Sequence, residues 1–132
     1  MQITRQADYA IRAVRYLAKQ GSSKRVATSK VATEMKIPPS FLAKIISQLS
    51  IAGLLHTSRG ARGGVSLARE PQEISVLDVV EAIDGPILLN ECVGTKKPCT
   101  FEDDCLVHPI WIEVQESLVN RLRETRFDVL YN

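Results

Sequence analysis

The sequence predicts a mainly α-helical fold with one small β-hairpin, arranged as a compact domain followed by a long C-terminal helix. Three observations support this prediction. Apolar residues recur every three or four positions in five segments, two short apolar runs flank a glycine-rich stretch at 59–64, and turn residues separate these elements. The length of 132 residues suits one domain with an extension, which buries a reasonable core and leaves much surface exposed.

The N-terminal part of the chain contains two predicted helices. The first covers residues 4–20 and ends at Gly21, and its apolar residues share one face: Ala10, Val14, Leu17 and Ala18. The second begins at Thr28 or Ser29, both of which are competent N-caps, and it stops before the Ile-Pro-Pro stretch at 37–39. We therefore expect a short connection between two amphipathic helices.

A third helix, a hairpin and a fourth helix follow without long connections. Ser40 is expected to cap the third helix, which buries one apolar stripe and ends at Gly53. The glycines within 59–64 can supply the positive-φ turn of the hairpin. Ser75 and Asp78 have the spacing of a capping box for the fourth helix. Helix, turn, helix and hairpin in this order predict a winged helix-turn-helix, with the hairpin as the wing.

The last predicted helix runs from Pro109 to about Arg126, and the segment 90–108 before it lacks periodicity and is expected to be a loop. An apolar stripe follows this helix: Ile110, Trp111, Val114, Leu118, Val119 and Leu122. Such a stripe is too apolar to remain in water, so we expect the helix to join two copies in a homodimer. The expected organisation is a winged helix-turn-helix DNA-binding domain, a cysteine-containing loop and a dimerisation helix with its tail, over 1–85, 86–108 and 109–132.

The charge of the chain is strongly divided along its length. Residues 1–69 hold 12 Lys and Arg against 2 Asp and Glu, a net charge of +10, whereas residues 70–132 hold 5 against 13, a net charge of −8. A basic half of this size suits a phosphate backbone, while the acidic half must face away from the same polyanion. Two mixed, solvated surfaces are the alternative interpretation.

The predicted elements place basic and hydroxyl side chains where winged helices contact double-stranded DNA. The start of the third helix reaches base edges, the start of the second reaches phosphates, and arginines in a glycine-rich wing fit a narrow minor groove. In the other interpretation Ser40 only caps its helix and the arginines only keep the hairpin soluble. We expect DNA contacts from Thr28, Ser29, Lys30, Ser40, Lys44, Arg59, Arg62 and Gly63.

Three cysteines and a histidine lie in the predicted loop with the spacing C-x6-C-x5-C-x2-H: Cys92, Cys99, Cys105 and His108. An odd number of cysteines without a secretion signal argues against a disulfide framework and for a reducing, cytoplasmic compartment. No stretch approaches the ~18 apolar residues of a membrane span. Three thiolates need a fourth ligand, so the loop predicts an iron–sulfur cluster or a zinc site; three unrelated cysteines are the remaining alternative.

An enzyme is the other class of function to consider. His56 and His108 are the only histidines, and neither is paired with a nucleophile in the sequence. His56 lies on a predicted strand beside the hairpin tip, where a surface position or a phosphate contact is expected. The sequence therefore favours a DNA-binding regulator over an enzyme.

Five segments of the chain resemble the iron–sulfur winged-helix regulators typified by IscR, NsrR and RirA, within the Rrf-two superfamily. These segments are DYAIRAVRYLA, IPPSFLAKIISQL, AGLLHTSRGARGGVSLAR, ISVLDVVEAIDG and LVHPIW, and the similarity spans essentially the whole chain. The RGxxGG wing combined with the three cysteines is the most specific part. The resemblance implies a dimer joined by the C-terminal helix and a cluster in each subunit. It also implies promoter binding, most simply as a repressor of transcription, that changes with iron or cluster supply or with redox or nitrosative stress.

Members of this superfamily differ in the fourth cluster ligand, and the chain offers two candidates. His108 resembles the histidine that completes a [2Fe-2S] site in the IscR group, which we favour. Asp8 resembles the aspartate that completes a [4Fe-4S] site of the other subunit in the NsrR group. The six-residue gap between Cys92 and Cys99, against five in the IscR pattern, keeps [4Fe-4S] as an alternative. A zinc-bound or clusterless regulator acting as a thiol-redox switch is the second alternative.

Overall fold

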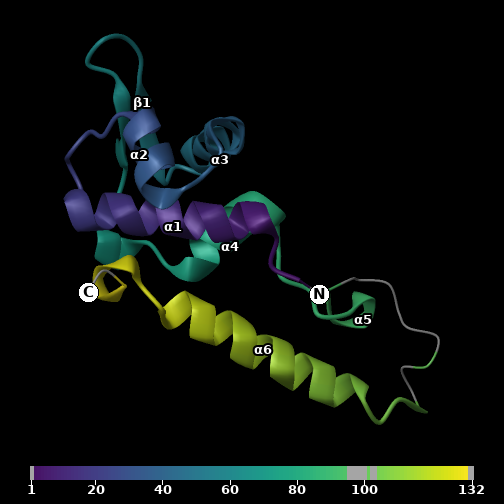
Figure 1. Ribbon diagram of the computed structural model, residues 1–132. Helices are drawn as coiled ribbons and strands as arrows, with labels where there is room; N and C mark the ends of the chain where they lie inside the picture. The colour runs from purple at the N-terminus through teal and green to yellow at the C-terminus, as the bar shows by residue number, and fades with distance from the viewer. Residues whose placement is uncertain (1, 95–100, 102–103, 131–132) are drawn as a thin grey trace.

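The computed structural model describes residues 2–94, 101 and 104–130 (Figure 1). The predicted mainly helical fold with a two-stranded antiparallel hairpin is confirmed. In Figure 1, α2, α3 and the hairpin lie on one side of α1, whereas α6 lies on the other side and extends away from the rest of the protein. The elements in order are α1 (Arg5–Gln20), α2 (Thr28–Met35), α3 (Pro39–Ile51), β1 (Leu55–Ser58), β2 (Gly64–Leu67), η1 (Pro71–Glu73), α4 (Val76–Asp84), α5 (Glu91–Gly94), α6 (His108–Glu124) and η3 (Phe127–Val129).

Two of the predicted helix ends are formed as expected. Ser75 Oγ accepts a hydrogen bond from the Asp78 N–H at 3.1 Å, and Asp78 Oδ2 accepts one from the Ser75 N–H at 2.9 Å, which completes the capping box of α4. Gly53 follows the end of α3 with φ of 78°, and the next N–H, that of Leu54, donates to the Leu49 carbonyl at 2.9 Å. This hydrogen bond from Leu54 back to α3 places the chain directly at the start of β1.

Two predicted caps are wrong. α2 begins at Thr28 itself, after Ala27, and makes no side-chain cap, while α3 begins at Pro39 with Pro38 as its N-cap, so that Ser40 is its second residue. Proline suits the first helical position because its φ is already helical and it has no N–H to leave unpaired. The hydroxyls of Thr28 and Ser40 are therefore not used in capping and lie exposed at the helix starts.

The hairpin is fixed at its base by a segment outside it. β1 and β2 pair antiparallel in a register that opposes Leu55 to Leu67. Val26 bridges to Val65, with N–H to carbonyl hydrogen bonds of 2.9 and 2.8 Å in the two directions. A Cβ on Gly64 would lie 2.4 Å from the Val26 carbonyl oxygen, so this close approach requires glycine. The position of the wing thus depends on the connection between α1 and α2.

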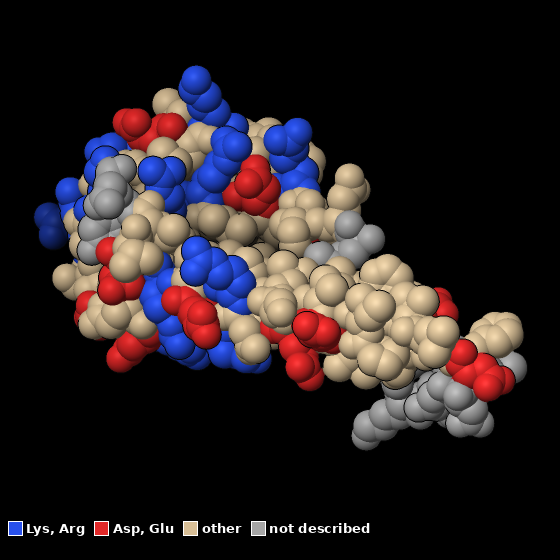
Figure 2. All heavy atoms as spheres, turned by 90° about the horizontal axis from the view of Figure 1, so that it is seen from below, with Lys and Arg blue, Asp and Glu red and all other residues tan. Residues whose placement is uncertain are grey.

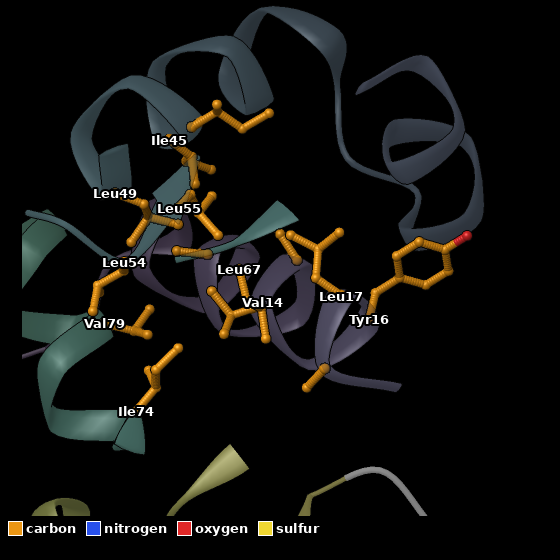
Figure 3. Close-up of a cluster of buried hydrophobic side chains, with 14 of the residues drawn as sticks. Val14, Tyr16, Leu17, Ile45, Leu49, Leu54, Leu55, Leu67, Ile74 and Val79 are labelled. Atoms are coloured by element: carbon orange, nitrogen blue, oxygen red, sulfur yellow. The ribbon is translucent and has the colours of Figure 1, made fainter. Parts of the chain in front are cut away.

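A single apolar core joins the helices to the hairpin (Figure 3). α1 contacts both α3 and α4, and α3 contacts β1. Buried side chains from all of these elements meet in the cluster, including Val14 and Leu17 of α1, Ile45 and Leu49 of α3, Leu55 and Leu67 of the hairpin, and Val79 of α4. Burial at this scale is what orders the short helices, since helices of 8 to 13 residues are marginal by themselves.

The chain returns to this core after α6. Phe127 is fully buried, at 0% exposure, among the core side chains. The Val76 N–H donates to the Thr125 carbonyl at 2.9 Å, and the Phe127 N–H donates to the Ile74 carbonyl at 3.1 Å. Arg15 Nε donates to the Leu130 carbonyl at 2.6 Å. We call residues 125–130 the C-terminal clamp, because they fasten the end of α6 to α1 and α4.

The cysteine segment needs one correction. Residues 91–94 form the single helical turn α5 rather than loop, and the Val93 N–H donates to the Asn90 carbonyl at 3.2 Å.

α6 begins one residue before the predicted Pro109 and ends two residues before the predicted Arg126, because the extended Thr125 leaves the helix to pair with α4. No helix among the described residues is long and apolar enough to cross a membrane.

Replacing Phe127 by alanine is expected to lower the free energy of unfolding by about 3–5 kcal/mol, as is typical when a fully buried aromatic side chain is removed. Denaturant unfolding followed by circular dichroism at fixed protein concentration measures this change. Val129→Ala is the matched control, because Val129 lies in the same clamp but is 63% exposed. Equal stability of the two variants would mean that the clamp does not support the core.

Candidate nucleic-acid interface and cysteine segment

The start of α2 offers unpaired donors to a phosphate. Thr28, Ser29 and Lys30 form its first turn, and all three side chains are exposed. The first N–H groups of a helix have no carbonyl in a preceding turn, and the helix dipole makes this end positive. No side-chain cap competes for these groups at α2. The predicted phosphate contacts therefore lie on a helix end that can accept an anion.

The outward face of α3 carries the predicted base-reading residues. Leu42, Ile45 and Leu49 are buried, which turns Ser40 and Lys44 to the exposed opposite side. Ser47 continues the same face one turn after Lys44 and is also exposed, although it is not among the residues predicted from the sequence. The spacing of three residues from Lys44 is the signal that could have identified it.

An aromatic pair holds the beginning of α3 against α1. The rings of Tyr9 and Phe41 meet edge to face with their centroids 6.2 Å apart, and the Arg5 guanidinium carbon lies 5.9 Å from the Tyr9 centroid. Such pairs prefer this T-shaped arrangement. Phe41 remains 43% exposed beside Ser40. The contact therefore positions the first turn of α3, a role that helical periodicity alone does not reveal.

The wing displays its arginines on a glycine-defined turn. Arg59 and Arg62 are exposed, and the Gly63 N–H donates to the Gly60 carbonyl at 2.9 Å. A Cβ on Gly63 would lie 2.5 Å from the Ser58 carbonyl oxygen, so the turn needs glycine there. Arg25, which sequence reasoning missed, donates from Nη1 to the Arg62 carbonyl at 3.2 Å. It adds a third cation at the wing and ties the tip to the segment before α2.

Cys92 and Cys105 both precede α6 in the chain. Both are free thiols of intermediate exposure, Cys92 in α5 and Cys105 three residues before α6. α5 contacts α6, and the Leu89 N–H donates to Gln115 Oε1 of α6 at 2.9 Å. Cys99 lies outside the described residues. Among the residues that are described, no group of three or more His, Cys, Asp or Glu side chains could hold a metal ion.

The two candidate fourth ligands have different surroundings. His108 is the first residue of α6, and its Nδ1 atom is buried without a hydrogen-bond partner in the described structure. A buried nitrogen without a partner is costly and is suited to a ligand. Asp8 instead lies 3.3 Å from Arg12 Nε across one turn of α1. Within the subunit, His108 is thus the candidate with a buried ring nitrogen that lacks a hydrogen-bond partner.

The apolar stripe of α6 divides into two halves. Its C-terminal residues Leu118, Val119 and Leu122 pack against the core, whereas Ile110 and Val114 near its start are 53% and 45% exposed. Figure 2 shows this free half of α6 as a mainly tan surface with red at its edges and no blue among the described residues on that face. The core of one subunit therefore covers only half of the stripe.

A profile of the Rrf2 family, described as iron-dependent transcriptional regulators, matches residues 3–132. The chain belongs to the Rrf2 family. It is 33% identical over 109 residues to the HTH-type transcriptional regulator NsrR of Shouchella clausii, covering 83% of this chain and 70% of that protein. It is 29% identical over 132 residues to the regulator IscR of Klebsiella pneumoniae, covering 100% of this chain and 80% of the relative.

Solved structures agree with this Rrf2 assignment. CymR of B. subtilis, described as the global cysteine regulator, superposes with a TM-score of 0.79 at 25% identity over 98% of this chain and 95% of the other. T. potens IscR superposes with a TM-score of 0.76 at 24% identity, over 98% and 85%. These structures confirm the expected winged-helix fold, and the family match and the sequence relatives confirm a role in transcription rather than catalysis.

We expect Arg59→Ala and Arg62→Ala each to weaken DNA binding by this Rrf2 protein. Each is also expected to lower the slope of log affinity against log salt by about 0.9, because one fewer phosphate is neutralised. Fluorescence anisotropy with duplex DNA at several salt concentrations measures both effects. Arg123→Ala is the control, since Arg123 lies on α6 and bonds to Asn120. An affinity that stays constant from low to physiological salt would contradict the electrostatic interface.

Proposed function

We propose that the protein is a homodimeric repressor that binds a pseudo-palindromic promoter operator and releases or retains it according to an iron–sulfur cluster. Cys92, Cys99, Cys105 and His108 are the proposed ligands, and iron or cluster supply, or redox or nitrosative stress, is the proposed signal. The main supporting observation is the buried Nδ1 atom of His108, which has no hydrogen-bond partner in the described structure. His108 is the first residue of α6 and follows Cys105 by three residues in the chain.

The donor set suits the proposed cofactor. Thiolates and a neutral imidazole are the usual ligands of iron–sulfur centres, and three cysteines with one histidine satisfy a [2Fe-2S] site. Asp8 of the partner subunit in place of His108 would favour [4Fe-4S]. When bound, such a cluster would be held by bonds between iron and the ligand side chains, and oxidation, nitric oxide or iron shortage can break these bonds. The chain supplies reduced cysteines of intermediate exposure for this purpose.

The ligands lie where they can influence α6. Cys92 belongs to α5, which contacts α6, while Cys105 lies three residues before that helix and His108 is its first residue. The C-terminal clamp holds the other end of α6 to the core. Ligation therefore fixes the start of a helix whose end is already fixed, and loss of ligation frees that start alone. A modest coupling free energy suffices, since about 1.4 kcal/mol changes DNA affinity tenfold.

The proposed dimer uses the free half of α6. Ile110, Trp111 and Val114 are large apolar residues left exposed on one subunit, and a second copy of the helix would cover them. Two subunits would then present two α3 helices to major grooves about 34 Å apart, one turn of DNA, which is the basis for a pseudo-palindromic operator.

A thiol-redox switch without a cluster is the second candidate. The free thiols of Cys92 and Cys105 are consistent with it, and the neighbour CymR is described as a cysteine regulator. Zinc at the same ligands would instead make the site structural.

Anaerobically purified protein is expected to be brown and to contain iron and sulfide, whereas Cys92→Ala and Cys105→Ala are expected to lose both. His108→Ala is expected to make the cluster labile while Asp8→Ala spares it, and His56→Ala is the control. Colourless protein that holds zinc or no metal would favour the second candidate. The opposite result for the His108 and Asp8 variants would assign the fourth ligand to Asp8.

Ile110→Asp is expected to shift the protein from dimer to monomer at micromolar concentration, because it places a charge in the proposed apolar interface. Sedimentation equilibrium measures the association, and Glu113→Asp, on the same helix, is the control. A wild-type protein that sediments as a monomer would remove the basis for the paired operator.

A further inference from the structure

A cleft between the end of α1 and α2 lies apart from the cysteine segment and shares only Lys30 with the proposed DNA contacts. Its volume is about 380 Å³, within the range of about 300–1,000 Å³ that small-molecule sites occupy. We call it the α1–α2 cleft and define it by its main lining residues, Arg15, Tyr16, Lys19, Lys30, Glu34 and Met35.

The charges around the cleft are unbalanced. Three cations, Arg15, Lys19 and Lys30, face a single carboxylate, that of Glu34. In the described part of the chain, none of these three cations forms an ion pair with a carboxylate, whereas Arg12 does so with Asp8. Cations gathered in a concave site without a counter-charge favour binding of an anion.

Two of the donors are held in place. Arg15 Nε donates to the Leu130 carbonyl at 2.6 Å, which orients the guanidinium and leaves its two terminal nitrogens available. The Tyr16 side chain is only 9% exposed, and Figure 3 shows its hydroxyl pointing away from the apolar cluster. Its hydroxyl forms no hydrogen bond in the described structure, and it lines the cleft. A fixed guanidinium and a fixed hydroxyl reduce the entropy lost on binding.

We propose that the α1–α2 cleft binds a small organic anion that carries carboxylate or phosphate groups. The anionic groups would bind Arg15, Lys19 and Lys30. The ring of Tyr16 and the side chain of Met35 would contact the carbon skeleton of the ligand. Glu34 would accept a hydrogen bond from a hydroxyl or amino group of the ligand. Glu34 disfavours an anion with negative charge on every side, so an asymmetric ligand is selected.

The cleft shares one residue with the proposed DNA interface. Lys30 lines the cleft and also belongs to the first turn of α2. A bound anion therefore competes with a DNA phosphate for this ammonium group, and by linkage DNA lowers the affinity for the anion by the same factor. This step rests on the proposed DNA-binding function, whereas anion binding by itself does not.

Calorimetric titration of the full-length protein without DNA tests the site, with inorganic phosphate, citrate and glycerol 3-phosphate as probes. We expect saturable binding of at least one organic probe, weakened at least tenfold in Lys19→Gln and unchanged in the control Lys24→Gln, whose exposed ammonium does not line the cleft. The absence of saturable binding by every probe, or equal weakening in both variants, overturns the proposal.

Operator binding with and without the organic probe separates the cleft from the DNA surface. We expect the probe to weaken DNA binding by the wild type, and Lys19→Gln to keep its DNA affinity within twofold while losing the response to the probe. If Lys19→Gln weakens DNA binding as strongly as Arg62→Ala, the cations serve DNA phosphates and the proposal is overturned. If the protein binds the probe but no DNA, the proposed function fails and the anion site is supported.

Discussion

Burial of Phe127 is the contact on which the arrangement of this protein depends. It is fully buried although it follows the long helix α6. Removal of its apolar surface from water opposes the entropy lost by ordering the six clamp residues, and backbone hydrogen bonds to Val76 of α4 and to Ile74 accompany it. Phe127 adds a fixed point after α6 to the packing of Leu118, Val119 and Leu122 against the core. With it, the C-terminal end of α6 has a defined position against α1 and α4.

The elements proposed to bind DNA are small, and contacts with neighbouring segments hold them in place. α2 has eight residues and no side-chain cap, and the hairpin has four residues in each strand. Val26 pairs with β2, Arg25 reaches the wing tip, and Tyr9 supports Phe41. The connection between α1 and α2 therefore determines where the wing arginines lie relative to α3. This dependence explains how a surface with few regular elements can still be preorganised.

Features that depend only on residues close together in the sequence were predicted correctly in most cases. The capping box of Ser75 and Asp78, the end of α3 at Gly53 and the glycine turn of the wing depend on neighbouring residues and were identified correctly. The caps at Thr28 and Ser40 were wrong because Ala27 and Pro38 take the cap positions instead. The burial of Phe127 and the bond from Arg25 to the wing depend on residues distant in sequence, so no local pattern signals them. For the same reason, spacing alone placed the cysteines in one segment without determining their geometry.

The chain leaves the core at one end of α4 and rejoins it at the other end of the same helix. The segment that includes α5 and α6 leaves α4 at its C-terminal end, after Asp84, and returns beside its N-terminal end, where Val76 pairs with Thr125. Both junctions therefore lie on one short helix within the same core. A segment inserted between two fixed points of a scaffold can diverge in sequence while the scaffold keeps its shape. Residues 86–124 thus form a segment that can change in sequence, and so respond to a different chemical signal, while the proposed DNA-contact surface stays the same.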